Sequence, residues 1–301
     1  MSHLVTITGA TGHVGKALAE QLLQSGVKIR AVGRDANKLA PLTARGAEAR
    51  AGDIENTAFL TEAFLGADAV FAMTPPNLNA PDLAAHQLRT AASLVEALKA
   101  AGVPRVVALS SAGASLPSGT GPIAGLHEFE ERLKSIPGLS VVALRSTFFM
   151  ENHLASIHLI KSAGINGSAA RADVAVGMIA TRDIAAAAAE YLTAPAFEGY
   201  TVRGLFGPRD YTYPEATAIL GAAIGKPDLA YVEFSYEDFR HGLLGAGFSA
   251  SVADAYVEMY TAFNDGRIQS TMRRDASNTT PTTLEEFARE VFAPAYGANQ
   301  N

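Results

Sequence analysis

The chain has 301 residues, of which 48% are hydrophobic and 18% are charged, so it can bury a sizeable core and lacks the composition of a disordered protein. Its formal net charge is −6 and its Lys and Arg residues are scattered, which excludes a basic surface for nucleic acid or for an anionic membrane. It contains no cysteine, which excludes disulfides, thiolate nucleophiles and cysteine-bound metals and suits a reducing compartment.

The N-terminus shows no targeting segment. Leu4–Thr8 runs directly into a glycine loop, with no basic region before it and no small-residue cleavage site after it. The most apolar later stretch, Val174–Leu192, is interrupted by Arg182, Asp183 and Glu190 and is too polar to span a bilayer. We therefore expect a soluble, cytoplasmic protein.

In the first half of the chain, short apolar runs alternate with longer helical patterns. The runs with the length and β-branched content of buried strands are Leu4–Thr8, Val27–Val32, Ala47–Ala51, Ala69–Ala72, Arg105–Leu109 and Ser140–Leu144. Helical spacing occurs at His13–Gln24, which Gly26 ends, and at Ala84–Ala101. Strands separated by helices predict right-handed βαβ units, and so a parallel, doubly wound α/β sheet in a first domain over residues 1–150.

The second half has a different texture, since all nine tyrosines lie at or after Tyr191. Its helical patterns are Tyr213–Ala223, Tyr236–Leu244, Ser249–Asn264 and Thr283–Phe292. The last of these begins with Thr283 and Glu286, which can form a capping box. No low-complexity linker separates the halves, so we expect a smaller, mostly helical lobe over residues 151–301, partly interwoven with the first domain.

A glycine loop, Gly9–Gly15, joins the first predicted strand to the first predicted helix. In such a loop Gly9 allows the tight turn, Gly12 lets the backbone approach a pyrophosphate, and Gly15 lets helix and strand pack closely. The helix N-terminus then offers unpaired N–H groups to the phosphates. This context predicts a Rossmann-type NAD(P)-binding domain. The predicted cofactor-binding residues of the loop are Gly9, Thr11, Gly12, His13, Val14 and Gly15.

The residue after the second predicted strand selects between the two nicotinamide cofactors. NAD-specific sites usually place an acid about 20 residues after the glycines, and here Arg34 stands 19 residues after Gly15 (34 − 15). A guanidinium can bind a 2′-phosphate, and Lys38 adds charge from the next helix. Asp35 would instead face a 2′-hydroxyl if the register were shifted by one residue. The pattern predicts NADP(H) in preference to NAD(H), with a solvated surface arginine as the alternative.

Three further strand ends belong to the predicted site, because ligands of such sheets bind at the carboxyl ends of the strands. The residues predicted to bind the cofactor there are Asp53, Ile54, Met73, Thr74, Pro75, Ser110 and Ser111. Asp53 could accept a hydrogen bond from the adenine amino group, and the Met73–Pro75 segment could pack on the adenosine and ribose. For each residue alone, an ordinary loop position is the alternative.

Segments spread over nearly the whole chain form one pattern: Gly9–Gly15, Arg34, Gly52-Asp53, Ser110–Gly113, Leu144–Asn152, Thr181–Ala185 and Thr280–Phe287. Together they resemble the NmrA-like group of atypical short-chain dehydrogenase/reductases, which includes NADPH-dependent quinone oxidoreductases and azoreductases. The resemblance implies that Phe148, Phe149 and Asn152 lie beside the nicotinamide, whereas core packing of the two aromatic rings is the alternative. Asp183 is expected to cap the helix that follows it.

One departure from the wider superfamily concerns catalysis. Typical short-chain dehydrogenases carry a Tyr-x-x-x-Lys pair after the serine of the fifth strand, and the tyrosine protonates the substrate oxygen. Between Ser111 and Lys134 this chain has neither Tyr nor Lys, and Leu126 stands where some relatives keep the lysine. The weak candidates left for a catalytic role are His127 and Asn152, with His153 as a further weak acid. For each histidine, an ordinary surface or hydrogen-bonded position is the alternative.

The missing acid bears on the acceptor. A simple ketone becomes a strongly basic alkoxide when it is reduced and needs an acid, whereas a quinone becomes a far less basic phenolate. We therefore expect an oxidoreductase that transfers a hydride from NADPH to a quinone-like or azo small molecule. The alternative is a non-catalytic NADP(H)-binding redox sensor that acts on a protein partner.

Two expectations concern the remaining site features. No metal site is expected, because the seven histidines show no ligand spacing with carboxylates on one helix face. By fold analogy, the substrate pocket is expected between the two regions, with walls from residues 73–79, 111–120, 148–153 and 230–250.

Overall fold

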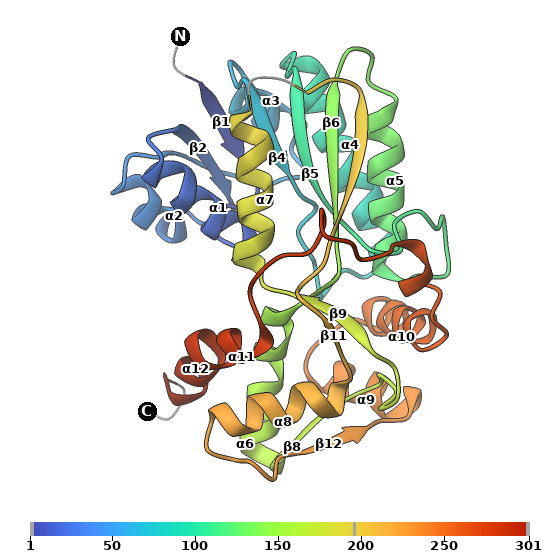
Figure 1. Cartoon of the computed structure of the whole chain (residues 1–301). Helices are drawn as coiled ribbons and strands as arrows, with labels where there is room; N and C mark the ends of the chain where they lie inside the picture. The colour runs from blue at the N-terminus through green and yellow to red at the C-terminus, as the bar shows by residue number, and fades with distance from the viewer. Residues whose placement is uncertain (1–2, 195–196, 299–301) are drawn as a thin grey trace.

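The structure is a computed structural model that describes residues 3–194 and 197–298. Its largest element is a seven-stranded parallel sheet with the order β10-β6-β5-β4-β1-β2-β3 (Figure 1). The strands are β1 (Leu4–Ile7), β2 (Lys28–Gly33), β3 (Glu48–Ala51), β4 (Ala69–Ala72), β5 (Arg105–Ser111), β6 (Ser140–Ser146) and β10 (Tyr200–Leu205). The strand order reverses between β1 and β4, so the predicted doubly wound α/β fold is confirmed.

Helices cover both faces of this sheet. One face carries α1 (His13–Gln24), α2 (Ala36–Thr43) and α7 (Thr181–Thr193). The other carries α3 (Thr57–Phe64), α4 (Leu83–Ala100) and α5 (Pro122–Lys134). Alternate strand residues face the two cores, so in β4 Phe71 packs with the first set of helices and Val70 with the second. Burial on both faces explains why the strands are continuous apolar runs.

Two strands run further than expected. β5 and β6 end at Ser111 and Ser146 because Ser110 and Ser111 still pair with Arg145 and Ser146. The hydroxyl of Ser146 is buried and donates to the carbonyl oxygen of Ser110 at 3.1 Å. The apolar pattern alone predicts that these strands end earlier. They continue because their polar residues form hydrogen bonds within the sheet.

A smaller region lies beyond the carboxyl ends of the strands, in the lower half of Figure 1. Its strands are β7 (Phe148–Phe149), β8 (Ile165–Ser168), β9 (Val176–Ile179), β11 (Asp210–Tyr211) and β12 (Ala230–Glu233). Its helices are η1 (Met150–Ser156), α6 (Ile157–Ala163), α8 (Tyr213–Ala223), α9 (Tyr236–Gly245), α10 (Ala250–Asn264), η2 (Gln269–Thr271), α11 (Leu284–Phe287), the π-helical turn η3 (Ala288–Phe292) and α12 (Ala293–Ala298).

The smaller region has its own core, built around Tyr211, Tyr213 and Phe287. The domain boundary at residue 150 stays a prediction, and residues 1–2, 195–196 and 299–301 of the two predicted domains lie outside the described residues. The chain crosses that boundary, because α7 packs on α1 and β10 pairs with β6 in the main sheet.

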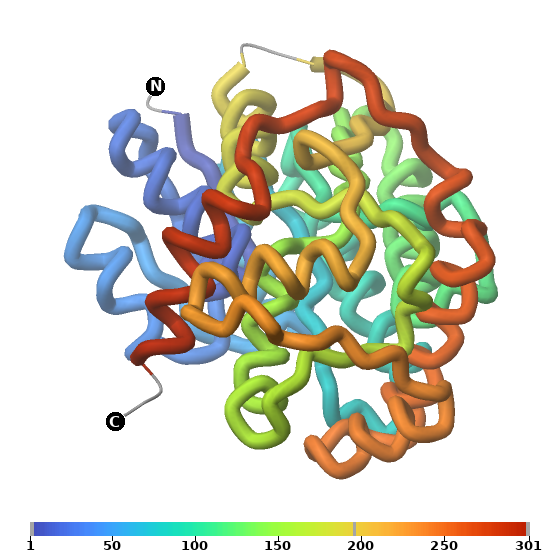
Figure 2. The backbone as a smooth tube through the Cα atoms, turned by 60° about the horizontal axis from the view of Figure 1, so that its bottom comes forward, coloured from blue at the N-terminus to red at the C-terminus, as the bar shows by residue number. Residues whose placement is uncertain are grey.

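The predicted single helix Thr283–Phe292 was wrong in its extent. Thr283 and Glu286 do form the expected capping box, but α11 passes into the η3 turn and then into α12, which ends at Ala298. Pro294 in α12 has no N–H for the carbonyl of Glu290, and the helical hydrogen-bond register changes just before it. Figures 1 and 2 show this C-terminal tail crossing the molecule from α10 past the end of α7.

Candidate functional site

The loop Gly9–Gly15, here called the glycine cradle, depends on glycine for different reasons at different positions. Gly9 has a φ of +65°, and a Cβ there would collide with the sulfur of Met73. A Cβ on Gly15 would collide with the carbonyl oxygen of Gly9, so only glycine lets α1 pack this closely on the loop. A Cβ on Gly12 would approach only that same oxygen, at 3.4 Å, and Gly12 is exposed. The fold requires Gly9 and Gly15, whereas Gly12 leaves an open face.

The N-terminus of α1 lacks the side-chain cap that its neighbours have. The side chains that cap α2, α3 and α4 are Asp35, Asn56 and Asp82. Gly12 caps α1 without any side chain, so the first N–H groups of this helix have no intrahelical partner. Thr11 and His13 are exposed beside them, whereas Val14 is buried and offers only its backbone. These donors can bind an anion.

The end of β2 lies beside the cradle. A Cβ on Gly33 would be 3.4 Å from Cγ2 of Thr11, so the two loops are in contact range. Arg34 and Lys38 follow and are both exposed. The carboxylate of Asp35 accepts from the backbone N–H of Asn37 at 2.9 Å and caps α2, which accounts for Asp35 without a ligand. The exposed cations that could meet a 2′-phosphate are Arg34 and Lys38.

The ends of β3 and β4 are fixed by local hydrogen bonds. Asp53 is exposed and accepts from the N–H of Glu55 at 2.9 Å, while Ile54 is buried. The N–H of Met73 donates to the hydroxyl of Thr8 at 2.9 Å, which holds the end of β4 against the cradle. Met73 also packs against the core of the main sheet.

The two serines at the end of β5 have different surroundings. Ser110 is buried, and its hydroxyl donates to the carboxylate of Glu130 at 2.5 Å; Arg145 and Tyr200 donate to the same carboxylate. Burial raises the pKa of Glu130, but these hydrogen bonds outweigh it and hold the pKa below its ordinary value. The Ser110 side chain therefore joins α5 to the sheet, whereas Ser111 is only partly buried.

The aromatic residues of β7 pack into two cores. Phe148 contacts His153 and Tyr213 edge to face, with ring centroids 5.3 and 5.8 Å away. Phe149 packs against the core of the main sheet. His153 is buried in this aromatic cluster, and burial lowers its pKa to about 4. The expectation that His153 could act as an acid was wrong, because its ring is neutral and enclosed near pH 7.

The two remaining catalytic candidates lie apart. Asn152 is exposed in η1, and within residues 3–194 and 197–298 its side chain makes no hydrogen bond. His127 on α5 is partly buried, and its Nδ1 lies 2.9 Å from the carbonyl oxygen of Ala114. That bond leaves only Nε2 of His127 for another group.

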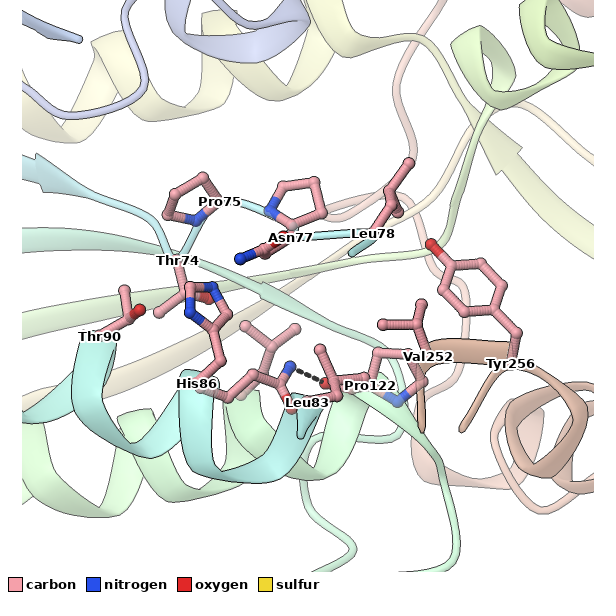
Figure 3. A pocket seen from close by; sticks show the side chains of 13 residues that line it. Thr74, Pro75, Asn77, Leu78, Leu83, His86, Thr90, Pro122, Val252 and Tyr256 are labelled. Carbon is pink, nitrogen blue, oxygen red and sulfur yellow. Dashed lines mark hydrogen bonds between the residues drawn. The ribbon is translucent and has the colours of Figure 1, made fainter. Parts of the chain in front are cut away.

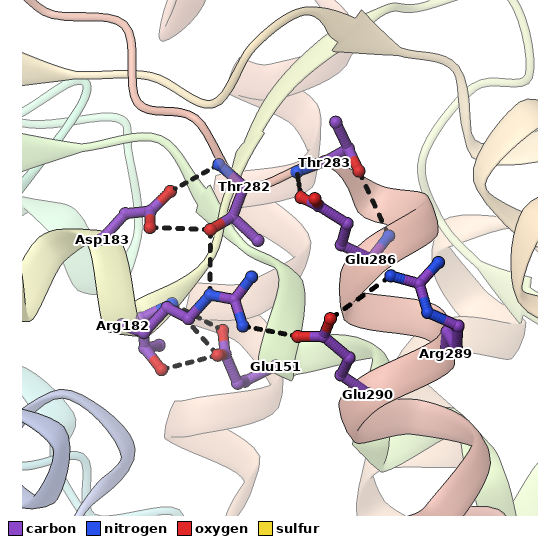
Figure 4. Close-up of polar contacts among 9 residues, drawn as sticks. Glu151, Arg182, Asp183, Thr282, Thr283, Glu286, Arg289 and Glu290 are labelled. Atoms are coloured by element: carbon purple, nitrogen blue, oxygen red, sulfur yellow. Dashed lines mark hydrogen bonds and ion pairs between the residues drawn. The ribbon is translucent and has the colours of Figure 1, made fainter.

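Three of the motif segments meet at the junction of α7 with the C-terminal tail (Figure 4). Glu151 accepts from the N–H and the hydroxyl of Thr181, the latter at 2.6 Å. Asp183 accepts from the N–H and the hydroxyl of Thr282 at 3.0 and 2.7 Å. Arg182 donates to the hydroxyl of Thr282 at 2.9 Å. We call these five residues the α7–tail junction.

This geometry corrects the role expected for Asp183. The N-cap of α7 is Ala180, and the carboxylate that meets the first N–H of α7 belongs to Glu151, about 30 residues earlier in the chain. Asp183 lies within the first turn of α7 and binds the tail instead. Its role is structural, as expected, but its partner is remote in sequence.

A cavity of about 140 Å³, here called the β4–α4 cavity, opens between the segment after β4 and helices α4, α5 and α10 (Figure 3). Its lining residues are Thr74, Pro75, Pro76, Asn77, Leu78, Leu83, His86, Gln87, Thr90, Pro122, Leu126, Val252 and Tyr256. Of the four segments predicted to line the substrate pocket, only 73–79 contributes to this cavity. The wall from α4 was not predicted, and residues 111–120, 148–153 and 230–250 do not line the cavity. The missed signal was a polar pair, His86 and Thr90, at helical spacing on the buried face of α4.

Within residues 3–194 and 197–298, no helix is long and apolar enough to cross a membrane. Within the same residues, no three or more His, Cys, Asp or Glu side chains gather where they could hold a metal ion.

The comparisons with known proteins agree with the cradle and with the motif segments. The chain is 30% identical to an NAD(P)H azoreductase of Xenophilus azovorans over 98% of its length and 100% of that protein. It is 28% identical to quinone oxidoreductase 2 of Escherichia coli, over 96% of this chain and 99% of that one. The crystal structure of the NADPH-dependent quinone oxidoreductase QOR2 of Escherichia coli, complexed with NADPH, superposes with a TM-score of 0.79 at 26% identity and covers 96% of this chain and 99% of that chain. The NmrA-like family model matches residues 1–288, and the chain belongs to that family.

Proposed function

We propose that this protein reduces a quinone-like or azo small molecule at the expense of NADPH. The broader class is shown by its relatives: it is an NAD(P)H-dependent oxidoreductase that binds a nicotinamide dinucleotide. The finer assignment of cofactor and acceptor rests on the residues of this chain. A cytoplasmic location remains part of the proposal.

The observation that carries the cofactor assignment is the uncapped start of α1 beside Arg34. The pyrophosphate would lie on the open face of Gly12 and accept from the free N–H groups of α1. Arg34 would meet the 2′-phosphate, because Asp35 is already occupied as the cap of α2. Asp53, Met73 and Pro75 would line the adenosine side of the same crevice.

The observation that carries the acceptor assignment is the lack of a proton donor at the expected place. When it is bound, the nicotinamide supplies the hydride. The chain between Ser111 and Lys134 supplies no Tyr and no Lys, and His153 is enclosed and neutral. A quinone needs no strong acid for reduction, because its charge spreads over the ring and both oxygens. Phe148, Phe149 and Asn152 are proposed to lie beside the nicotinamide, as the resemblance implies.

The test is an acceptor panel. The purified protein should oxidise NADPH with simple quinones or azo compounds and should leave unactivated ketones unreduced, as followed by absorbance at the nicotinamide band. Fast ketone reduction would contradict the proposal, since it would require an acid. Tight NADPH binding without turnover on any acceptor would favour the non-catalytic sensor acting on a protein partner.

A further inference from the structure

The β4–α4 cavity contains two buried polar atoms that have no hydrogen-bond partner in the described structure. Nε2 of His86 and Oγ1 of Thr90 are both enclosed and unpaired, and the residues are only 9% and 0% exposed. They lie four residues apart on α4, so they share one face of the helix. Figure 3 shows both side chains directed toward the segment that begins at Thr74. Buried polar groups normally have partners, so this pair calls for a ligand.

A contact between Nδ1 of His86 and a neighbouring carboxylate fixes the orientation of the imidazole ring. Nδ1 of His86 lies 2.6 Å from a carboxylate oxygen of Glu55, whose other oxygen accepts from Arg89 at 2.9 Å. The hydrogen bond from Arg89, despite partial burial and with help from His86, holds the pKa of Glu55 below its ordinary value. A carboxylate can only accept, so the proton of this bond sits on Nδ1. In the neutral imidazole, Nε2 then presents a lone pair to the cavity.

The remaining walls set the shape of the ligand. They are mostly apolar, with contributions from Pro75, Leu83, Leu126 and Val252. The volume of about 140 Å³ fits one six-membered ring, since a dry cavity of about 150 Å³ holds benzene. A ring hydroxyl could donate to Nε2 of His86 and accept from the hydroxyl of Thr90, which would satisfy both atoms with one group.

We propose that the β4–α4 cavity binds a single aromatic ring through a phenolic hydroxyl, held between His86 and Thr90. This inference deepens the proposed function and rests on it for its biological meaning: the ring is that of the acceptor in its reduced, hydroxyl-bearing form. The cavity adjoins the proposed cofactor site because Thr74 and Pro75 belong to both. Glu55 is a positioning residue that acts through His86.

The test uses phenol as the probe and toluene as a ring of similar size without a hydroxyl, in the absence of cofactor. Phenol should bind to the full chain and shift the Nε2 nitrogen resonance of His86, which is assigned from its loss in His86→Gln. Toluene should bind about tenfold more weakly, as expected for one lost hydrogen-bonding group, and leave that resonance in place. Equal affinities, or an unmoved resonance in saturating phenol, would overturn the proposal and assign the pair to buried water.

Variants separate this site from a general loss of packing. Thr90→Val keeps the shape and removes the hydroxyl, so phenol affinity should fall about tenfold while toluene affinity is unchanged. Ser93→Ala is the matched control, because Ser93 is buried on the same helix but bonds to Thr57 at 3.2 Å, outside the cavity. It should bind phenol as the wild type does, and a tenfold loss there would count against the site.

Failure of the ring site and failure of the proposed quinone reductase would give different results. A wild type that binds phenol at His86 but reduces no quinone with NADPH would keep the ring site and reject the quinone reductase. The opposite result would be that the wild type and Thr90→Val reduce quinones with the same KM and that phenol leaves the His86 resonance unchanged. This result would keep the reductase and reject the ring site.

Discussion

The glycine cradle and the α7–tail junction each lie at the start of a helix, but the first backbone N–H groups of the two helices have opposite surroundings. At α1 the donors are left open, and the chain there is glycine with exposed neighbours. At α7 the first N–H is met by the buried carboxylate of Glu151. The open donors at α1 fit a ligand, whereas the bonded donor at α7 joins two distant segments of the fold.

The largest effect is expected at the open helix start. Gly12→Val should weaken NADPH binding by at least about a hundredfold, because the side chain would occupy the space of the pyrophosphate. Its melting temperature should stay close to that of the wild type, since a Cβ at Gly12 would meet only the Gly9 carbonyl oxygen, at 3.4 Å. Gly15→Val is the matched contrast. Its melting temperature should fall, because its Cβ collides with the Gly9 carbonyl. Calorimetry that still shows tight NADPH binding to Gly12→Val would place the phosphates elsewhere.

The next effect is expected at the closed helix start. Glu151→Ala leaves the buried N–H and hydroxyl of Thr181 without partners and should lower the free energy of unfolding by about 2–4 kcal/mol in urea. Glu290→Ala breaks only exposed ion pairs, with Arg182 and Arg289, and should leave stability unchanged. If Glu151→Ala lowered the free energy of unfolding no more than Glu290→Ala, the buried bonds of Glu151 would contribute no more than an exposed ion pair.

The aromatic cluster gives a pH dependence. The folded pKa of His153, about 4, lies below the ordinary value of 6.5, so the unfolded chain takes up the proton first as the pH falls. The contribution of His153 is fully present above pH 6.5 and is lost progressively down to about pH 4, by about 3 kcal/mol in all. His153→Phe should flatten the unfolding free energy over this range relative to the wild type. Parallel pH profiles for the two proteins would show that the ring is hydrated when folded.

Cofactor preference should show a smaller change. Arg34→Ala should raise the Kd for NADPH about ten- to a hundredfold and leave that for NADH unchanged, because only NADPH carries the 2′-phosphate. Arg45→Ala, an exposed arginine that pairs with Glu20 beyond the end of α2, is the control and should change neither. Equal wild-type affinities for the two cofactors would contradict the role of Arg34.

The smallest effect is expected at His127. Its Nδ1 is engaged with the carbonyl of Ala114, and a quinone needs no strong acid, so His127→Ala should keep quinone turnover within a few-fold of the wild type. A loss of about a hundredfold or more in kcat would make His127 a general acid.

The sequence predicted best what is local. The spacing of Gly9, Gly12 and Gly15 predicted the strand–loop–helix unit, and the apolar runs predicted six strands of the main sheet. These features need only neighbouring residues, because a turn or a helix start is fixed within a few positions. The position of Arg34 after β2 could be read in the same way.

What escaped prediction depends on partners far along the chain. Glu151 meets Thr181, Asp183 meets Thr282, and His86 meets Glu55 only because the fold brings them together. No spacing rule links such positions. The seventh strand, β10, was missed for the same reason: Tyr200–Leu205 has mixed polarity and becomes a strand by pairing with β6 at the sheet edge.

The bond between Asp183 and Thr282 also orders events during synthesis. A ribosome makes α7 about a hundred residues before it makes Thr282, so this carboxylate emerges without its partner. Phe206, just after the last strand of the main sheet, likewise waits for the backbone of Asn278 and Thr280. The N-terminal sheet can fold early, as domains do during translation. Its contacts with the tail form only after the tail has left the exit tunnel. Chains that stop short of the tail would therefore present an unfinished edge to chaperones and proteases, although the glycine cradle had already formed.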